Sequence, residues 1–214
     1  PTAASSIVIN ADGENMIAVN LAANEFLDLA FLHEQAERFE AADTVLCQLE
    51  NNLDAIQLAF QLAGKNNALR VLNPAPVHPE LERGLLDSAD VLTPNETEFS
   101  LLCKRFADID IPADQVAHAD DGKLHDCCRA LSANTVVITL GRFGCFVSHG
   151  QNLRRDSRSY YRVEPEAVNA IDTTGAGDAF SGSLVAALSL LGEQPFYDAI
   201  HYAGRVAALS TETI

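Results

Sequence analysis

The chain has 214 residues, of which 48% are hydrophobic, and its formal net charge is −16, from 14 Lys and Arg against 30 Asp and Glu. This length and composition suffice for the core of one large domain or for two small domains. The acidic balance excludes nonspecific binding to nucleic acid or to an anionic membrane, because both need a basic surface. A small anionic ligand stays compatible, since backbone amides, a helix N-terminus and a cation can hold it.

The cysteine and histidine patterns argue against a disulfide framework and a structural metal site. The five cysteines are odd in number and form no repeated CxxC pair, so reduced thiols in a cytosolic protein are the default expectation. The six histidines show no HxxxH spacing. No apolar run approaches the roughly 20 residues that span a bilayer, and no signal peptide is visible. We therefore expect a cytoplasmic protein without a membrane segment.

The predicted elements begin with a β-hairpin and then alternate between strands and helices. Residues 5–10 and 16–20 are β-prone and flank "ADGE" at 11–14, where Asp-Gly is a strong turn signal. Hydrophobic spacing then predicts helices over 28–41, 52–63, 81–89, 96–106, 124–131, 177–191 and 195–209, and strands over 44–50 (buried on both faces), 69–76, 90–95, 134–141, 144–150 and 159–164. The polar segments 107–121 and 150–158 are expected at the surface. This alternation predicts an α/β fold, with a mostly parallel sheet and helices on both faces.

Polar side chains gather where the predicted strands end. In sheets of this kind, ligands bind at the carboxyl ends of the strands. The polar clusters at these ends are Gln48 and Glu50, Asn73, Asn95 to Glu98, and Thr139 to Gly144. They predict a binding site along that edge of the sheet.

The stretch "NAIDTTGAGDAFSGSLVAAL", residues 169–188, places an acid where a glycine-rich turn becomes a helix. Gly175 and Gly177 permit a turn that aims backbone amides at one point, and the helix adds its positive dipole end, which together predict an anion hole. As a simple helix-dipole partner, Asp178 would contribute at most about 1 kcal/mol, and the glycines and Asp172 would stay unexplained. A phosphoryl group in the turn, with Asp178 as general base, explains all of them. P-loop, protein-kinase and GxGxxG motifs are absent.

Five motifs together resemble the ribokinase family of carbohydrate kinases, also called the phosphofructokinase-B family. They are "QLE" at 48–50, "NPAP" at 73–76, "TPNETE" at 93–98, "TLGRFG" at 139–144 and "DTTGAGDAF" at 172–180. Their order and approximate spacing match the family over almost the whole chain. The resemblance implies a three-layer αβα, Rossmann-like fold with a small β lid. It also implies ATP-dependent phosphorylation of a sugar hydroxyl, with the 5-hydroxyl of ribose as the leading candidate.

The resemblance assigns roles to individual residues. It implies Asp178 as the catalytic base that also contacts the sugar, and Glu50 as a second sugar contact. It further implies an anion hole of Gly175, Ala176 and Gly177. It implies that Glu98 helps to bind Mg²⁺ and that Asp172 and Thr174 help to bind K⁺. The implied nucleotide contacts are Asn95, Thr139, Leu140, Gly141, Arg142, Phe143, Gly144 and Gly177. Simpler interpretations exist for three of these: Glu50 as a solvated charge, "NETE" as a capped helix start, and "TLGRFG" as a strand–turn–strand.

Several family features have no counterpart in the sequence. Neither the family's N-terminal sugar-contacting aspartate nor its "GGKGAN"-like motif is found, and the Gly-Ala-rich C-terminal loop is missing. The chain is therefore expected to begin about a third of the way in and to leave one sheet edge exposed. Residues 1–22 are interpreted as the remnant of a lid through which the intact protein forms a homodimer, and 23–214 as the kinase core. Ala22 and Gly204 also depart from the family pattern.

Two alternatives to a ribose kinase stay open at this point. One is a related kinase for fructose, another pentose or a nucleoside, because the N-terminal sugar contacts that would decide are absent. The other is a truncated, non-catalytic chain that binds the nucleotide only. A dinucleotide-binding oxidoreductase is disfavoured, because no glycine-rich first βα turn is present.

Overall fold

The computed structural model describes residues 2–9 and 15–212 and contains a mixed six-stranded sheet. The strands lie in sequence order across this sheet. The first four pair in parallel and the last two are antiparallel to their neighbours. The bounds are β3 Thr44–Cys47, β4 Leu69–Leu72, β5 Val91–Leu92, β6 Thr135–Thr139, β7 Cys145–Ser148 and β8 Tyr160–Val163.

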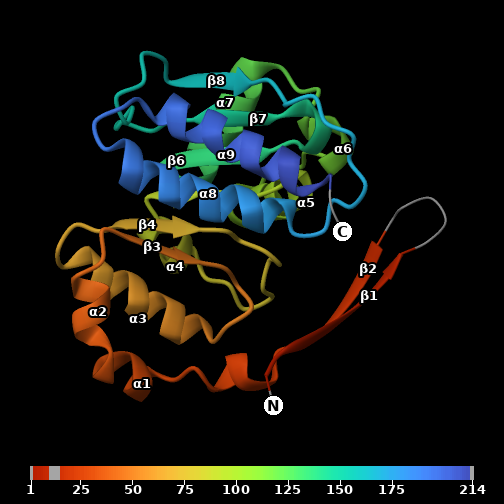
Figure 1. Cartoon of the computed structure of the whole chain (residues 1–214). Helices are drawn as coiled ribbons and strands as arrows, with labels where there is room; N and C mark the ends of the chain where they lie inside the picture. Colours follow the sequence, from red (N-terminus) through yellow and green to blue (C-terminus); the bar gives the residue numbers. More distant parts are fainter. Residues whose placement is uncertain (1, 10–14, 213–214) are drawn as a thin grey trace.

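Helices cover both faces of the sheet and form three layers (Figure 1). One face packs against α3 Leu53–Gly64, α4 Arg83–Ser88, α5 Glu96–Phe106 and α7 Asp121–Leu131. The other packs against α8 Ala176–Leu191 and α9 Phe196–Ser210, which lie side by side. Alternation along β6 explains the two cores, because Val136 and Ile138 join the first and Val137 joins the second. The predicted α/β fold is confirmed.

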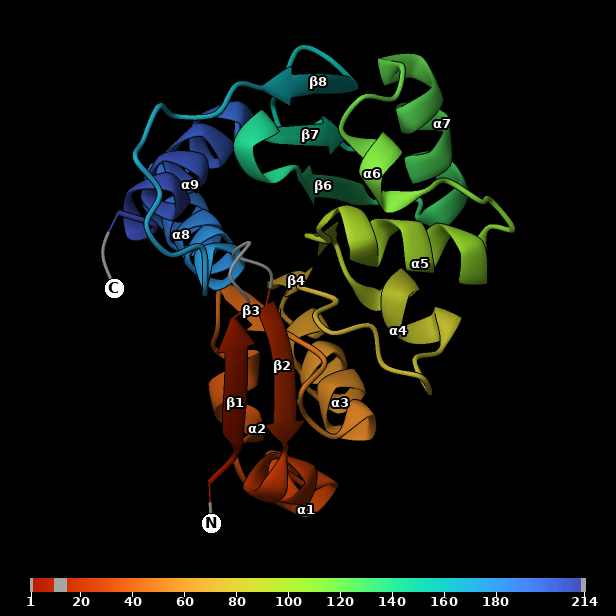
Figure 2. The ribbon, with the colours of Figure 1, turned by 90° about the vertical axis from the view of Figure 1, so that its right-hand side faces the viewer.

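A two-stranded antiparallel hairpin projects from the α/β body (Figures 1 and 2). Its strands are β1 Ala4–Ile9 and β2 Asn15–Asn20, as the sequence predicts. The expected Asp-Gly turn at 11–14 lies outside the described residues. A short 3₁₀ turn, η1 Ala22–Phe26, leads from the hairpin into the body.

The predicted helix over 28–41 is two short helices, α1 Leu29–Glu34 and α2 Ala36–Glu40. Asp28 caps the first, because its carboxylate accepts a hydrogen bond from the amide of Phe31 at 2.8 Å. The backbone of Gln35 leaves the helical region and ends α1. Leu32 is the one buried residue of these two helices, and it packs against Ala55 and Ala59 of α3.

Three local expectations differ from the structure. The strand over 44–50 was expected to be buried on both faces, but β3 is an edge strand and Leu46 is 37% exposed. The segment 107–121 contains the short helix α6 Ala113–Val116, and its Val116 side chain is fully buried. In the polar segment 150–158 the Asp156 side chain is buried, and its carboxylate accepts a hydrogen bond from buried His149.

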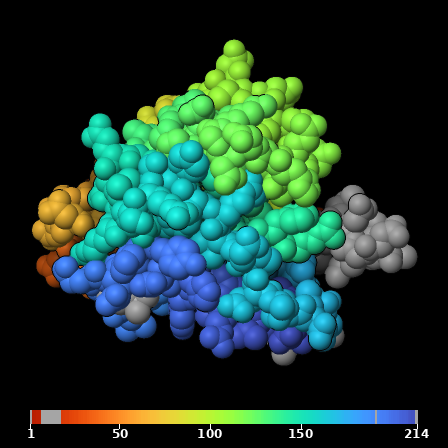
Figure 3. All heavy atoms as spheres, turned by 90° about the horizontal axis from the view of Figure 1, so that it is seen from above, coloured from red at the N-terminus to blue at the C-terminus, as the bar shows by residue number. Residues whose placement is uncertain are grey.

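The surface seen from above shows how the last elements meet (Figure 3). The segment that contains β7, β8 and the following loop lies between the α6–α7 region and the α8–α9 pair. Among the described residues, no helix has the length and hydropathy of a membrane span.

Candidate active site

The carboxyl ends of the parallel strands lie in register and bring the polar motifs together. The amide of Asn73 donates to the carbonyl of Cys47 at 2.9 Å, and the amide of Thr93 donates to that of Leu72 at 3.0 Å. Beyond β5, the amide of Thr139 donates to the carbonyl of Pro94 at 2.9 Å. The motifs at 48–50, 73–76, 93–98 and 139–144 therefore share one edge, as the sequence predicts.

Glu50 is held by its neighbours in "QLE". The Gln48 side-chain amide donates to Oε2 of Glu50 at 3.1 Å, while the amide of Glu50 donates to Oε1 of Gln48 at 2.6 Å. Asn51 donates to the same Gln48 oxygen. The Glu50 carboxylate is half-buried and held by hydrogen bonds, so it differs from the freely solvated charge of the simpler interpretation.

The turn before α8 has the backbone geometry that its glycines predict. Gly175 adopts a left-handed φ of 76°, which other residues rarely adopt, and it forms the N-cap of the helix. The amide of Ala176 donates to the carbonyl of Thr173 at 3.2 Å. The following first-turn amides, of Gly177 and Asp178, have no acceptor inside the helix and are the donors best suited to an anion.

Asp178 lies on the exposed first turn of α8, close to the end of β5. One turn later, the buried hydroxyl of Ser181 bonds that of Thr93 at 3.2 Å and ties α8 to β5. The pKa of Glu98 is raised, first by burial and also by the negative charges of Glu96 and Asp178. The two motifs that supply Asp178 and Glu98, 80 residues apart in the sequence, therefore act on one another.

Asn95 and Glu98 form a capping box at the start of α5. The Asn95 side chain accepts from the Glu98 amide at 2.9 Å, and Glu98 Oε2 accepts from the Asn95 amide at 2.9 Å. Oε1 of Glu98 accepts from the Asn95 side-chain amide at 3.0 Å. The simple interpretation of "NETE" as a helix cap is thus correct, and the same residues still face the strand-end edge.

The loop of Asp172 is fixed to the end of α9. The Thr211 carbonyl accepts from the amides of Ile171 and Asp172 at 2.7 and 3.1 Å. Oδ1 of Asp172 accepts from the amide of Thr174 at 2.8 Å, and this hydrogen bond lowers the pKa of Asp172. An ionised carboxylate is therefore held beside the glycine-rich turn.

The "TLGRFG" loop folds back on itself at the end of β6. The amide of Leu140 donates to the carbonyl of Gly144 at 2.8 Å, around the 3₁₀ turn η2 Gly141–Phe143. Gly144 has a φ of 78°, and a Cβ there would lie 2.0 Å from the carbonyl oxygen of Val163. Only glycine fits this position, so the loop has one defined course against β8.

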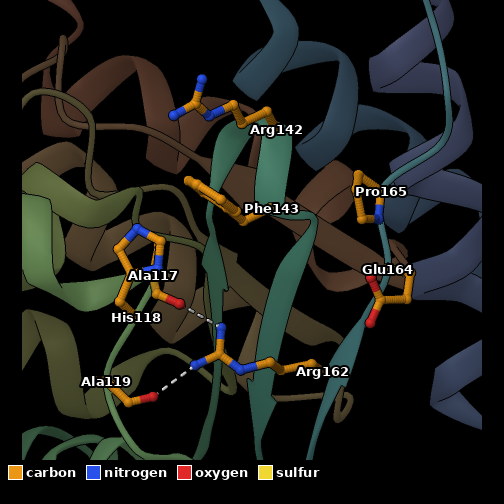
Figure 4. Close-up of a pocket in the computed structure, with 8 residues that line it drawn as sticks. All are labelled: Ala117, His118, Ala119, Arg142, Phe143, Arg162, Glu164 and Pro165. Carbon is orange, nitrogen blue, oxygen red and sulfur yellow. Dashed lines mark hydrogen bonds between the residues drawn. The ribbon is translucent and has the colours of Figure 1, made fainter.

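A cavity of about 390 Å³ lies beside this loop (Figure 4). The Phe143 ring points into it and meets the ring of His118 edge-on at 4.8 Å. Arg162 holds the opposite wall by donating to the carbonyls of Ala117 and Ala119. Of the residues that line this cavity, only Arg142 and Phe143 belong to a sequence motif. The others come from the α6–α7 segment and from β8 and the residues after it, and they belong to no recognisable motif.

Oxygen ligands dominate the strand-end edge. Among the residues with described placement, no group of three or more His, Cys, Asp or Glu side chains is arranged to hold a metal ion. Mg²⁺ usually keeps several waters and binds through one or two carboxylates together with substrate phosphates. The buried Glu98 beside Asp178 fits that kind of site, and it does not fit a transition-metal cage.

A known protein family and several known relatives match nearly the whole chain. The chain matches the profile "pfkB family carbohydrate kinase" over residues 1–214. It is 36% identical over 209 residues to the ribokinase of Haemophilus influenzae, covering 98% of this chain and 62% of that protein. It is 32% identical over 211 residues to the ribokinase of Staphylococcus aureus, covering 99% and 64%. The chain thus spans less than two thirds of these relatives.

A solved ribokinase structure has the same fold as this chain. The structure of Arabidopsis thaliana ribokinase complexed with ribose and ATP superposes with a TM-score of 0.76 at 22% identity. The match covers 100% of this chain and 64% of that one. At this identity the likeness shows the fold alone. The family profile matches residues 1–214, and the chain therefore belongs to the pfkB family of carbohydrate kinases.

Proposed function

We propose that this chain supplies the catalytic centre of an ATP-dependent sugar kinase that converts D-ribose and ATP to ribose 5-phosphate and ADP. Two relatives named ribokinase support the substrate. The observation that carries the proposal is the position of Asp178, on the exposed first turn of α8, which the Ser181–Thr93 hydrogen bond ties to the end of β5.

Asp178 acts as the general base in this proposal. Its exposed carboxylate accepts the proton of the attacking sugar hydroxyl as the oxygen–phosphorus bond forms and the bond to ADP breaks. A positioned base contributes about 10²- to 10⁴-fold to such a step. The first-turn amides of Gly177 and Asp178, at the end of the Gly175–Gly177 turn, stabilise the negative charge on the transferred phosphoryl group.

Two cations fit the residues around this centre. Mg²⁺ bound with ATP would neutralise phosphate charge, and the buried Glu98 would hold it through water. Asp172 and the backbone of Thr174 would contribute part of a K⁺ site beside the turn. The hydrogen bond from the Thr174 amide holds the Asp172 carboxylate beside the turn, which supports this role.

The remaining assignments follow the motifs. Asn95 and the loop from Thr139 to Gly144 contact the nucleotide, and Glu50, fixed by Gln48, contacts the sugar. The hairpin β1–β2 is proposed as part of a lid, and as a homodimer contact in a cytoplasmic enzyme. Size-exclusion chromatography with light scattering tests the dimer.

A panel of acceptors tests the reaction. ADP release from Mg·ATP is followed with D-ribose, D-fructose, deoxyribose and adenosine, and ATP binding is measured by calorimetry. The proposal expects the highest kcat/KM for D-ribose. A preference for another acceptor would overturn the ribose assignment, and ATP binding without turnover on any acceptor would identify a chain that only binds the nucleotide.

A further inference from the structure

A second cavity lies at the opposite ends of the strands from the candidate active site. Its volume is about 580 Å³, within the range of small-molecule sites. It opens between the first residues of β3 and β4, the β7–β8 loop, the last turns of α8 and the start of α9. Its polar and charged lining residues are Asp43, Thr44, Asn152, Arg154, Arg155, Ser189 and Gln194.

Arg154 brings a partly buried positive charge to this cavity. Its Nε donates to the Thr135 hydroxyl at 2.9 Å and its Nη2 to the carbonyl of Asp90 at 2.8 Å, and both acceptors are neutral. The Asp90 carboxylate is itself engaged by Arg70, at 2.9 Å. Burial lowers the pKa of Arg154, and the negative charge of Asp90 opposes this shift only in part.

Arg155 adds a second guanidinium at the rim. It donates to the carbonyl of Gly192 at 2.7 Å and lies 3.4 Å from the exposed carboxylate of Glu193. The lining holds these two arginines and one acid, Asp43, and Glu193 pairs with Arg155 at the rim, so the formal charges around the cavity sum to zero. In a chain with a net charge of −16, the surroundings of this cavity are therefore less acidic than the molecule as a whole.

The loop that presents both arginines is firmly anchored. Asp156, the next residue, accepts from buried His149 at 2.9 Å and from the amide of Tyr197 at 2.9 Å. The guanidinium of Arg154 also lies 5.8 Å from the centre of the Phe196 ring. The two positive groups are thus held in place before any ligand arrives.

We propose that this cavity binds a small organic anion, with a carboxylate or phosphate group facing Arg154 and Arg155. Guanidinium groups recognise both anions through paired, charge-assisted hydrogen bonds. The proposal is independent of the proposed function. Because Ser189 lines the cavity and Asp178 lies on the first turn of the same helix, α8 extends from this site to the candidate active site (Figure 1).

Calorimetry at constant ionic strength tests the proposal with two probes, citrate for carboxylates and inorganic sulfate for tetrahedral oxyanions. Arg155→Ala removes a lining charge, and Arg158→Ala removes an exposed arginine of the same loop that does not line the cavity. Ser189→Trp fills the cavity.

At least one probe is expected to bind the wild type and Arg158→Ala equally, with Kd raised about tenfold in Arg155→Ala. Ser189→Trp, checked for folding by circular dichroism, should not bind it.

Several outcomes would overturn the anion site. One is the absence of binding of either probe to the wild type at millimolar concentration. Another is equal affinity in Arg155→Ala and the wild type, which would place the anion elsewhere, such as at the α8 N-terminus. Equal losses in Arg155→Ala and Arg158→Ala would indicate only a general effect of net charge. If Ser189→Trp does not fold, the two arginine variants decide.

Discussion

At the residue scale, the two glycines before Asp178 have different physical roles. Gly175 needs its left-handed backbone, whereas Gly177 has an ordinary helical φ and open space where a Cβ would lie. The fold therefore requires glycine at the first position only. The proposed anion hole would account for the absence of a side chain at Gly177, because a side chain there would hinder access of an anion to the first-turn amides.

Gly177→Ala separates these roles. Alanine is the better helix former, so the free energy of unfolding should stay equal or rise by up to about 1 kcal/mol. Turnover should fall at least about tenfold, because the methyl group displaces the phosphoryl group from the amides. Urea unfolding and steady-state kinetics measure the two effects.

Gly182→Ala is the matched control, because Gly182 lies in the same helix, is exposed and also has open space at its Cβ. It should gain stability and keep its activity. Equal activities of Gly177→Ala and Gly182→Ala would show that Gly177 does not face the reacting group.

At the element scale, one hydroxyl pair joins the layer of α8 to the sheet. Thr93 and Ser181 are each 3% exposed and bond at 3.2 Å. The contact fixes α8 relative to β5 and thereby Asp178 relative to Glu98. Burial makes each hydroxyl dependent on the other for a partner.

Ser181→Ala leaves the Thr93 hydroxyl buried without this partner, so the free energy of unfolding should fall by about 1–3 kcal/mol. Thr93→Val removes the other half. In the double variant the loss should be smaller than the sum of the two single losses, as urea unfolding will show. Additive losses would mean that the two hydroxyls do not stabilise each other.

The sequence predicts elements best where local signals agree. The helix over 96–106 has the expected bounds, because Asn95 and Glu98 form a cap that can be read from their spacing. The break at Gln35 has no such signal and was missed. The strand-end edge was predictable from motifs, whereas His118 against Phe143 was not, because that contact depends on how α6 packs.

At the scale of the whole molecule, a buried polar network joins β6, the β7–β8 loop and α9. Arg154 Nε donates to the Thr135 hydroxyl; because the neutral His149 ring donates through Nε2 to Asp156, its Nδ1 accepts a hydrogen bond from that hydroxyl. His149 Nε2 then donates to Asp156, which also accepts from Tyr161. Sequence alone cannot reveal this network, because its members come from separate polar positions that only the fold brings together.

This network predicts a pH dependence of stability. The pKa of His149 is lowered, chiefly by burial, so the folded state holds the ring neutral. The unfolded chain binds a proton below about pH 6.5, and the free energy of unfolding should therefore decrease as pH falls below that value. Urea unfolding between pH 7.5 and about 5.5 measures this slope. His149→Gln should be less stable but show a shallower slope, and an unchanged slope would assign the dependence to other groups.

Asp178 is proposed as the proton acceptor of a phosphoryl transfer, and kcat for ribose phosphorylation in Asp178→Asn tests this role directly. Asp198→Asn is the matched control, because both acids are the third residue of a helix, α8 or α9. We expect kcat to fall about 10²- to 10⁴-fold in Asp178→Asn and to stay near the wild-type value in Asp198→Asn. Similar kcat values in both variants would show that Asp178 serves only the helix dipole, and would contradict the account.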